Sequence, residues 1–506
     1  MIEYISEKQL SIFDFKTPFE QELSADNRWV RLASAVPWDT FANLYISLMD
    51  SSQGRPGISP RIILGALIIK HKENLSDENT ILAIQENIYM QFFVGLKSFQ
   101  KEKIFDSSLF VTIRKRIGKA HFDLLNEELI KNLSQKSDLK NNSKKDDNDG
   151  FPPNKGKMQA DATVADQYIT FPTDAKLLNT CRKKLEVMID DLYCYFDKDM
   201  VKPRTYRKTL NTSFLSYSKK KNKSKATHRK MKRKLLEAVN RDLGYVRNLV
   251  QKAENLVMGK DFPLTPKDLE LIKTIETVYA QQKLMYDGRT NSCKDRIVSL
   301  HQPHVRPILR GKQNSRVEFG SKIGASLDNG FVLLTTLSWN AYHEGKDLIS
   351  HCNDYFRIHG HFPELVQVDK AYATRENRNW LKERNIRITA VPLGRRPKEK
   401  KSPYQKAKLK KEAAERNHIE GKFGQGKNGY NLNKVRARLK ETSELWVSCI
   451  FFVMNLINYQ KKSSFGPYSD SFWTELIAFI VRYRSKMNFG FFASQFYLKK
   501  MKFKVA

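Results

Sequence analysis

The sequence predicts a mixed α/β core preceded by an all-helical region, and three observations carry this prediction. Apolar residues recur at helical spacing between about residues 38 and 135. From residue 158 onward, short strand-like runs alternate with helical segments, which is the order of a mixed α/β domain. Hydrophobic residues make up 40% of the 506-residue chain and aromatic residues 11%, which is typical of a globular protein.

The N-terminal helices have recognisable start signals. Ser59 and Pro60 supply a cap and a first-turn proline, and further helices are expected to begin after Ser76 and Asp106. In the third of these helices three cations are expected to point largely outward, namely Arg114, Lys115 and Arg116. Short helices in this order, the last one basic, suit a helix-turn-helix-like DNA reader. The alternative is a helical domain for packing or oligomerisation.

Polar and apolar patterning divides the chain into four parts. Residues 136–157 are polar, charged and Pro/Gly-bearing, which indicates a linker. The expected organisation is a helical N-terminal DNA-binding domain at 1–135, the linker, a mixed α/β domain at 158–462 with a mostly helical basic insertion at about 175–300, and a C-terminal segment at 463–506. That last segment contains a second apolar helix and a basic tail, and no role is assigned to it.

The core is expected to begin with a strand at 158–165. A hairpin follows the insertion, with strands at 317–326 and 331–337 around Asp328-Asn329-Gly330. The remaining elements are a helix at 345–358, a strand at 365–369, a helix at 374–383, a strand at 386–391 and helices at 409–423 and 441–459. With the insertion set aside, this order equals that of a ribonuclease H-like fold.

The charge balance points to a polyanionic partner. Lys and Arg number 89 against 55 Asp and Glu, a formal net charge of +34. Fourteen of these cations lie between Val201 and Leu235 without one acidic residue, which favours a surface that faces phosphates. The apolar run at 445–458 is too short to span a bilayer, and no secretory signal is recognised. Five scattered cysteines favour a reducing, cytoplasmic location.

Three acidic residues are candidates for phosphodiester chemistry. Two divalent ions held by shared carboxylates activate a nucleophile and stabilise the leaving oxygen. Asp161 lies on the first expected strand, Asp369 ends an apolar strand, and Glu420 lies on a helix one turn after Arg416. The alternatives are ordinary: an aspartate that closes a strand is often a cap, and an Arg/Glu pair at this spacing is often a helix salt bridge.

Three stretches around these acids resemble the motifs of bacterial insertion-sequence transposases of the DDE class. They are Asp161-Ala-Thr followed by Phe171-Pro-Thr-Asp174, then Val368-Asp369-Lys-Ala-Tyr372, and Arg416-Asn-His-Ile-Glu420 with Lys427 seven residues later. The N-terminal stretch from Pro60 to Arg116 is similar to the helical domain of the same family. One departure is Ala413, where the family often has a tyrosine; Tyr404 is a candidate substitute.

The resemblance implies an activity and its parts. Asp161, Asp369 and Glu420 would hold two Mg²⁺ or Mn²⁺ ions, which would release a 3′-hydroxyl at the element end and direct it at target DNA. Arg416 and Lys427 would hold phosphates. Tyr372 would contact a phosphate or a base, with core packing as the equal alternative. The implied partners are double-stranded DNA, both terminal inverted repeats and target, and a second copy of the chain.

Two other function classes stay open. One is an inactive DNA-binding relic or regulator, and the other is a ribonuclease H-like nuclease that only hydrolyses. The pairs His301/His304 and His359/His361 lack a matching partner at zinc spacing. Three glycines, Gly421, Gly424 and Gly426, are expected to end the third-motif helix and let the lysine after them turn towards the site.

Overall fold

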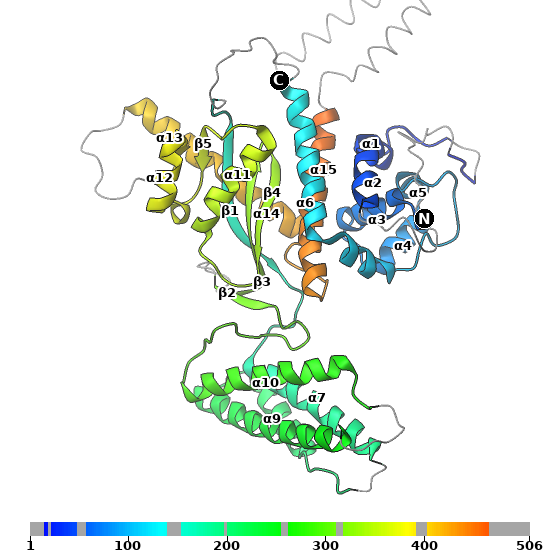
Figure 1. The fold of residues 1–506 in the computed structure, drawn as a ribbon, viewed down its shortest axis with the longest axis vertical. Coiled ribbons are helices and arrows are strands. Elements are labelled where there is room, and N and C mark those ends of the chain that lie inside the picture. Colours follow the sequence, from blue (N-terminus) through cyan, green and yellow to red (C-terminus); the bar gives the residue numbers. More distant parts are fainter. Residues whose placement is uncertain are drawn as a thin grey trace, which may run out of the picture.

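A six-stranded sheet with helices on both faces and a separate helical bundle form a mixed α/β arrangement (Figure 1). The computed structural model describes residues 15–18, 22–47, 57–138, 153–196, 200–254, 262–309, 317–390 and 402–464. No helix in these ranges is long and apolar enough to cross a membrane. The middle of the expected linker, at 139–152, and the expected C-terminal helix and basic tail, within 465–506, lie outside the described residues.

The first elements are helices, as the apolar spacing predicts. They are α1 (Arg28–Ala35), α2 (Trp38–Ile46), α3 (Pro60–Lys72), α4 (Asp77–Glu86), α5 (Ile88–Phe93) and α6 (Leu109–Asp138). The Ser76 hydroxyl accepts a hydrogen bond from the Asn79 amide at 3.1 Å and so caps α4, as expected. Gly118, with φ +66°, interrupts α6 and kinks it.

The prediction that Arg114 points outward is wrong. This side chain is only 4% exposed, and its guanidinium contacts both carboxylate oxygens of Asp77, at 2.7 and 2.9 Å. The equally buried Lys70 contacts Asp77 at 2.8 Å, and its ammonium lies 4.6 Å from the Trp446 ring centroid. A buried cation requires a paired carboxylate. Asp77 supplies it from the start of α4, a contact between helices that helical periodicity cannot indicate.

The sheet is built around one long strand. The strands are β1 (Lys157–Asp166), β2 (Arg306–Leu309), β3 (Val317–Asp328), β4 (Phe331–Ser338), β5 (Leu365–Gln367) and β6 (Arg387–Ile388). Strand β3 pairs antiparallel with β1 along one edge and with β2 and β4 along the other. Strands β1 and β5 are parallel, as are β5 and β6. The predicted hairpin is confirmed, with Asn329 and Gly330 at positive φ in the turn.

Helices cover the two faces of the sheet with separate apolar clusters. On one face lie η1 (Glu344–Asp347), α11 (Leu348–His359), η2 (Lys370–Tyr372) and α12 (Arg375–Glu383), and on the other α13 (Pro403–Glu415), α14 (Asn417–Gly429) and α15 (Lys440–Ser464). Met158 and Ala160 of β1 pack under α11 and α12. Ala165 at the other end of β1 packs under α14 and α15. Residues on alternate sides of β1 therefore belong to different layers.

The single helix expected at 409–423 is instead two helices that meet at Arg416. The prediction that glycines end the second helix is also wrong, because α14 continues through all three of them to Gly429. Ile419 and Phe423 are 0% and 5% exposed against the sheet. Burial of this apolar side sustains the helix despite the low helix propensity of glycine.

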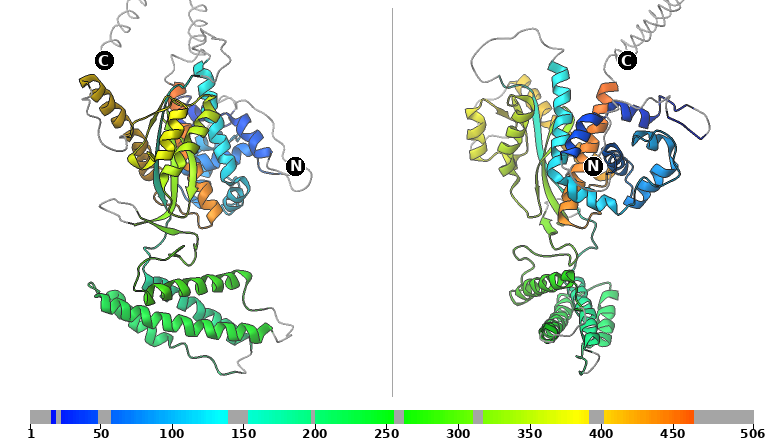
Figure 2. Two further views of the ribbon diagram at one scale, coloured as in Figure 1. Left: turned by 60° about the vertical axis from the view of Figure 1, so that its left-hand side comes forward. Right: turned by 45° about the vertical axis from the view of Figure 1, so that its right-hand side comes forward.

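The insertion after β1 is a bundle of helices beyond the β2–β3 end of the sheet (Figures 1 and 2). Its helices are α7 (Asp174–Tyr195), α8 (Arg207–Lys219), α9 (Lys225–Glu254) and α10 (Pro266–Asp287). Leucine and other aliphatic side chains of α7, α9 and α10 form their own core. No residue of α8 is buried. The basic segment therefore covers an independent core and presents most of its cations to solvent, Lys232 being a buried exception.

Asp174 ties three segments of this bundle together. It lies in the first turn of α7, and its carboxylate accepts hydrogen bonds from Arg296 at 2.6 Å, Lys232 at 2.9 Å and Gln282 at 3.1 Å. Burial opposes ionisation of this carboxyl, but the hydrogen bond and charge of Lys232 outweigh it and hold the pKa of Asp174 below its ordinary value. Asp174, which belongs to the first stretch that resembles the transposase family, therefore stabilises the helical bundle.

We predict that Asp174→Ala loosens the bundle, because Lys232 and Arg296 lose their shared carboxylate in a largely buried place. Removing one partner of such a pair costs about 3 kcal/mol or more. Hydrogen exchange should show faster exchange across α7, α9 and α10, with the sheet unchanged. Asp191→Ala, an exposed position on the same helix, is the matched control. Equal exchange in both variants would contradict the role of Asp174.

Candidate active site

Asp161 and Asp369 come from neighbouring parallel strands and lie at the same level of the sheet. Gln159 of β1 pairs in register with Gln367 of β5, and each aspartate follows two residues later. Because side chains alternate along a strand, both aspartates face the side on which these glutamines lie. Asp369 lies two residues after the end of β5 and caps η2, its carboxylate accepting a hydrogen bond from the Ala371 amide. Asp161 lies on β1 as predicted, whereas Asp369 lies beyond the end of β5 and caps η2, which is the ordinary alternative for an aspartate that closes a strand.

Glu420 approaches the two aspartates from above the sheet. It lies in the first turn of α14, which packs on β1. A cavity of about 370 Å³ is lined by Asp161, Asp369, Glu420 and Arg416 together. Arg416 and Glu420 form a salt bridge of 3.0 Å, in which the glutamate side chain is 52% exposed. The structure thus brings the three predicted acids and the arginine of the third motif to one cavity.

The environment of Asp161 disfavours the ionised form of its carboxyl. Burial, and to a lesser extent the nearby charges of Glu344 and Glu420, raise the pKa of Asp161 to about 6. The hydrogen bond from the Ala162 amide, 2.8 Å long, and the charge of Arg416 act in the opposite direction. Burial of the Asp161 carboxyl, more than the charges around it, is therefore what opposes its ionisation.

The donor set suits a hard divalent cation, since carboxylate oxygens are the ligands that Mg²⁺ and Mn²⁺ prefer. The crowding of negative charge at Asp161 gives such an ion a favourable place. Among the described residues, however, no three His, Cys, Asp or Glu side chains are gathered closely enough to hold a metal ion. One reason is visible in the salt bridge, which turns the Glu420 carboxylate towards Arg416.

The two other predicted phosphate ligands lie outside this cavity. The Lys427 ammonium is 3.3 Å from Glu318 and 4.0 Å from Asp166, near the end of β1, so its charge is offset within the protein. It lies seven residues beyond Glu420, roughly 10 Å along the helix. Tyr372 is 0% exposed and packs in the core under α11 and α12, as the packing alternative has it. A direct contact of Tyr372 with DNA would require this core to open.

Tyr404 does not lie where the family often has a tyrosine, which is the position of Ala413 in this chain. It is 77% exposed in the first turn of α13, nine residues before Ala413. That separation corresponds to about 14 Å along the helix. Ala413 itself is exposed on the last turn of α13. A contact made by the family's tyrosine at this place is therefore absent from the described part of this chain.

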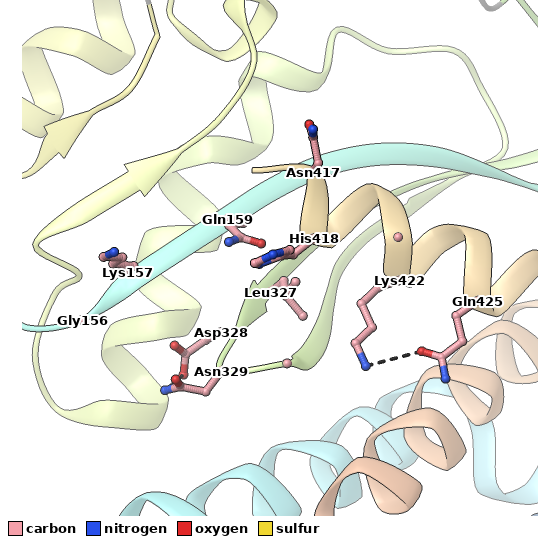
Figure 3. Close-up of a pocket in the computed structure, with 12 residues that line it drawn as sticks. Gly156, Lys157, Gln159, Leu327, Asp328, Asn329, Asn417, His418, Lys422 and Gln425 are labelled. Carbon is pink, nitrogen blue, oxygen red and sulfur yellow. Dashed lines mark hydrogen bonds between the residues drawn. The ribbon is translucent and has the colours of Figure 1, made fainter. Parts of the chain in front are cut away.

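A larger cavity of about 780 Å³ lies on the other side of α14 and contains none of the three acids. Figure 3 shows His418 and Lys422 of α14 on this side, with His418 beside Gln159 and Leu327 of the sheet and Lys422 directed towards Gln425. His418, placed between Arg416 and Glu420 in the sequence, therefore points away from the acidic cavity. The larger of these two cavities is therefore not the one that contains the three predicted acids.

Two residues that line the acidic cavity were not predicted from the sequence. Lys322 of β3 and Glu344 of η1 line it together with the three predicted acids. Lys322 lies in Glu318-Phe-Gly-Ser-Lys322, a stretch that also resembles the family and could have pointed to it. Glu344 begins a short 3-10 turn before a predicted helix, where an acidic residue is an ordinary helix-start feature and attracts no attention.

Two separate regions of the chain match models of known protein families. Residues 366–457 match the family model described as "Transposase DDE domain", a range that includes Asp369, Arg416 and Glu420. Residues 17–116 match the one described as "Transposase domain (DUF772)". Asp161 and the helical insertion lie between the two matches.

A curated relative is similar to part of the chain. The "Uncharacterized protein ORF8 in nfe locus" of Rhizobium meliloti is 34% identical over 148 residues, which are 29% of this chain and 66% of the relative. The chain thus spans somewhat less than two thirds of that relative's length. The chain thus contains two transposase domains in the order expected from the sequence, and these matches support its assignment to the insertion-sequence transposases of the DDE class.

Proposed function

We propose that this protein cleaves DNA at the ends of an insertion sequence and joins the released 3′-ends to target DNA. The observation that carries the proposal is the convergence of Asp161, Asp369 and Glu420 on one cavity from two strands and a helix. The order of β1, the β3–β4 hairpin, β5 and β6 supports a ribonuclease H-like core with the helical bundle as an insertion. Carboxylates on such rigid elements keep the reacting groups aligned.

The three acids would hold two Mg²⁺ or Mn²⁺ ions. When bound, these ions supply activation of a water or 3′-hydroxyl and stabilisation of the leaving oxygen. Asp161 and Asp369 form the rigid side of the site, because each follows a paired strand segment. Glu420 forms the adjustable side, since its side chain is half exposed and must leave Arg416 to reach an ion. Arg416, once released, faces the cavity and is placed to hold a phosphate.

The helical insertion would provide non-specific DNA affinity. Twelve of its cations between 202 and 234 are exposed, on the segment before α8, on α8 itself, on the turn after it and on the start of α9; they are Lys202, Arg204, Lys208, Lys219, Lys220, Lys221, Lys223, Lys225, Arg229, Lys230, Arg233 and Lys234. The N-terminal helices would read the element end with the exposed Lys115 and Arg116. Two copies would act on a pair of ends, as the family resemblance implies.

The first prediction concerns the chemistry itself. Purified protein with Mg²⁺ should nick linear DNA that carries the element's end and join the 3′-end to a target plasmid. Asp369→Asn should reduce both activities by about a hundredfold or more while DNA binding persists. The matched control is Asp191→Asn, an exposed residue of α7.

The outcomes separate the remaining classes. Nicking without any joined product would favour a purely hydrolytic nuclease. Binding without nicking in either Mg²⁺ or Mn²⁺ would leave an inactive DNA-binding protein. Equal cleavage by the wild type and Asp369→Asn would remove that aspartate from the site.

A second prediction follows from the raised pKa of Asp161. A carboxyl whose pKa rises from 3.8 to about 6 on folding lowers stability progressively between about pH 4 and 6 and keeps it lowered above that range. Asp161→Asn should therefore stabilise the metal-free protein at pH 7.5, by at most about 3 kcal/mol, and have little effect at pH 4. Thermal unfolding at both pH values measures this difference. Mg²⁺ should stabilise the wild type more than the variant, and a destabilised variant at pH 7.5 would contradict the assignment.

A third prediction concerns the insertion. Replacing Lys219, Lys220 and Lys221 together by Gln should weaken binding to DNA of any sequence. The slope of log affinity against log salt should fall by roughly 0.9 for each phosphate that the variant no longer neutralises. The control replaces Lys267, Lys273 and Lys283 of α10, which are exposed but interspersed with acidic residues. Binding isotherms at several salt concentrations measure both slopes, and equal slopes would refute a phosphate-facing α8.

A further inference from the structure

A fourth carboxylate, that of Glu344, lines the cavity of the three predicted acids. It begins η1, the 3-10 turn that follows β4 and leads into α11. Its side chain is 24% exposed, so it is partly withdrawn from solvent. A glutamate without a role at this cavity would be more stable in solvent, because burial of a carboxylate is costly without a compensating partner.

The backbone around Glu344 is tied to the turn that carries Asp369. A Cβ atom at Gly345 would lie 2.6 Å from the carbonyl oxygen of Ala371, so the two turns approach as closely as glycine allows. The buried Asn377 side chain donates hydrogen bonds to the carbonyl oxygens of Gly345, at 2.6 Å, and Tyr372, at 2.7 Å. One amide thus bridges the turn after Glu344 and the turn after Asp369. The position of Glu344 relative to the site is therefore fixed by the fold.

Lys322 holds the Glu344 carboxylate in this structure. Its ammonium lies 3.1 Å from a Glu344 carboxylate oxygen and donates to the Tyr342 carbonyl oxygen at 2.9 Å. The lysine is itself a lining residue of the cavity. A cation therefore already occupies the place beside Glu344, and the negative charge of Glu344 also acts on Asp161. The Lys322 ammonium therefore offsets part of the negative charge of Glu344 and Asp161, as a bound metal ion would.

A buried hydroxyl provides an independent observation. The Tyr372 side chain is 0% exposed, and its hydroxyl has no hydrogen-bond partner among the described residues. After burial, the charges of Glu344 and Asp161 are the main influences that raise the pKa of Tyr372, which places its hydroxyl near these two carboxylates. An unsatisfied buried hydroxyl costs about 1–3 kcal/mol. A carboxylate drawn inward by an ion would accept its hydrogen bond.

We propose that Glu344 is a fourth ligand of the metal site and binds one divalent cation together with Asp161. Lys322 releases Glu344 when the ion enters, and the Tyr372 hydroxyl then donates to one of the two carboxylates and orients it. This inference rests on the proposed function, because it extends the same cavity. A purely structural Lys322–Glu344 salt bridge is the alternative. It would account for the 3.1 Å distance between the two side chains but not for the unpartnered hydroxyl.

The test is Mn²⁺ binding to the full-length protein, alone and with DNA carrying the element's end, measured from the electron paramagnetic resonance signal of free Mn²⁺. Glu344→Gln should lose one bound ion or bind it at least about tenfold more weakly. Glu376→Gln, an exposed glutamate on α12, is the matched control and should bind as the wild type. Lys322→Gln should bind Mn²⁺ more tightly, because the competing ammonium is gone. A salt bridge without a metal role predicts that neither Glu344→Gln nor Lys322→Gln changes Mn²⁺ binding.

Asp369→Asn makes the two possible failures distinguishable. If Asp369→Asn weakens Mn²⁺ binding and Glu344→Gln does not, the fourth ligand is overturned and the proposed site stands. If the wild type binds no Mn²⁺, or Asp369→Asn binds it unchanged, the metal site and the fourth ligand fall together. Circular dichroism and thermal unfolding show whether Glu344→Gln is folded. If it is not, Glu344→Asp, which keeps the charge and shortens the reach, should still show weakened Mn²⁺ binding.

Discussion

Helix α15 is the constraint on which the rest of the core depends, because two hydrophobic clusters share it. One side packs against the N-terminal helices through residues such as Leu445, Phe452 and Leu456. The other packs under the sheet with α14, through Ile450 and Phe451 among others. A helix that is apolar on all sides has to be covered on all sides. The two matched transposase regions therefore meet on one helix.

Polar contacts fix the register of this packing. The Asn455 side chain of α15 accepts a hydrogen bond from the Val332 amide at 2.8 Å and donates to the Val332 carbonyl oxygen at 2.6 Å. It also donates to Asn126 of α6 at 2.7 Å. One buried amide thus joins β4, α6 and α15, and a slip of any of the three would leave polar groups unsatisfied. Because α14 rests on the same cluster as α15, the height of Glu420 above the sheet follows from this packing.

Local patterns predicted the elements well, and the contacts between elements much less. Strand β1 and the Asn329-Gly330 hairpin were readable, because period-two alternation and turn residues are local signals, whereas the matched level of Asp161 and Asp369 follows only from the register of β1 and β5. The burial of Arg114 was not, since its partner Asp77 lies on another helix. The break at Arg416 was also missed: neither proline nor glycine marks it in the sequence, and Arg416 itself keeps right-handed helical backbone angles.

The acidic cavity illustrates the same limit and adds an electrostatic argument. Motif spacing brings out three acids, but Glu344 belongs to the site only through the contacts of Gly345 and Asn377. In this structure Glu420 is paired with Arg416, and Glu344 with Lys322. On the proposed function, divalent ions would take over the carboxylates and free these two cations for DNA phosphates. Metal ions and DNA would then each favour the binding of the other, since such coupling is reciprocal. The internal salt bridges would keep the site closed to chemistry until both are present.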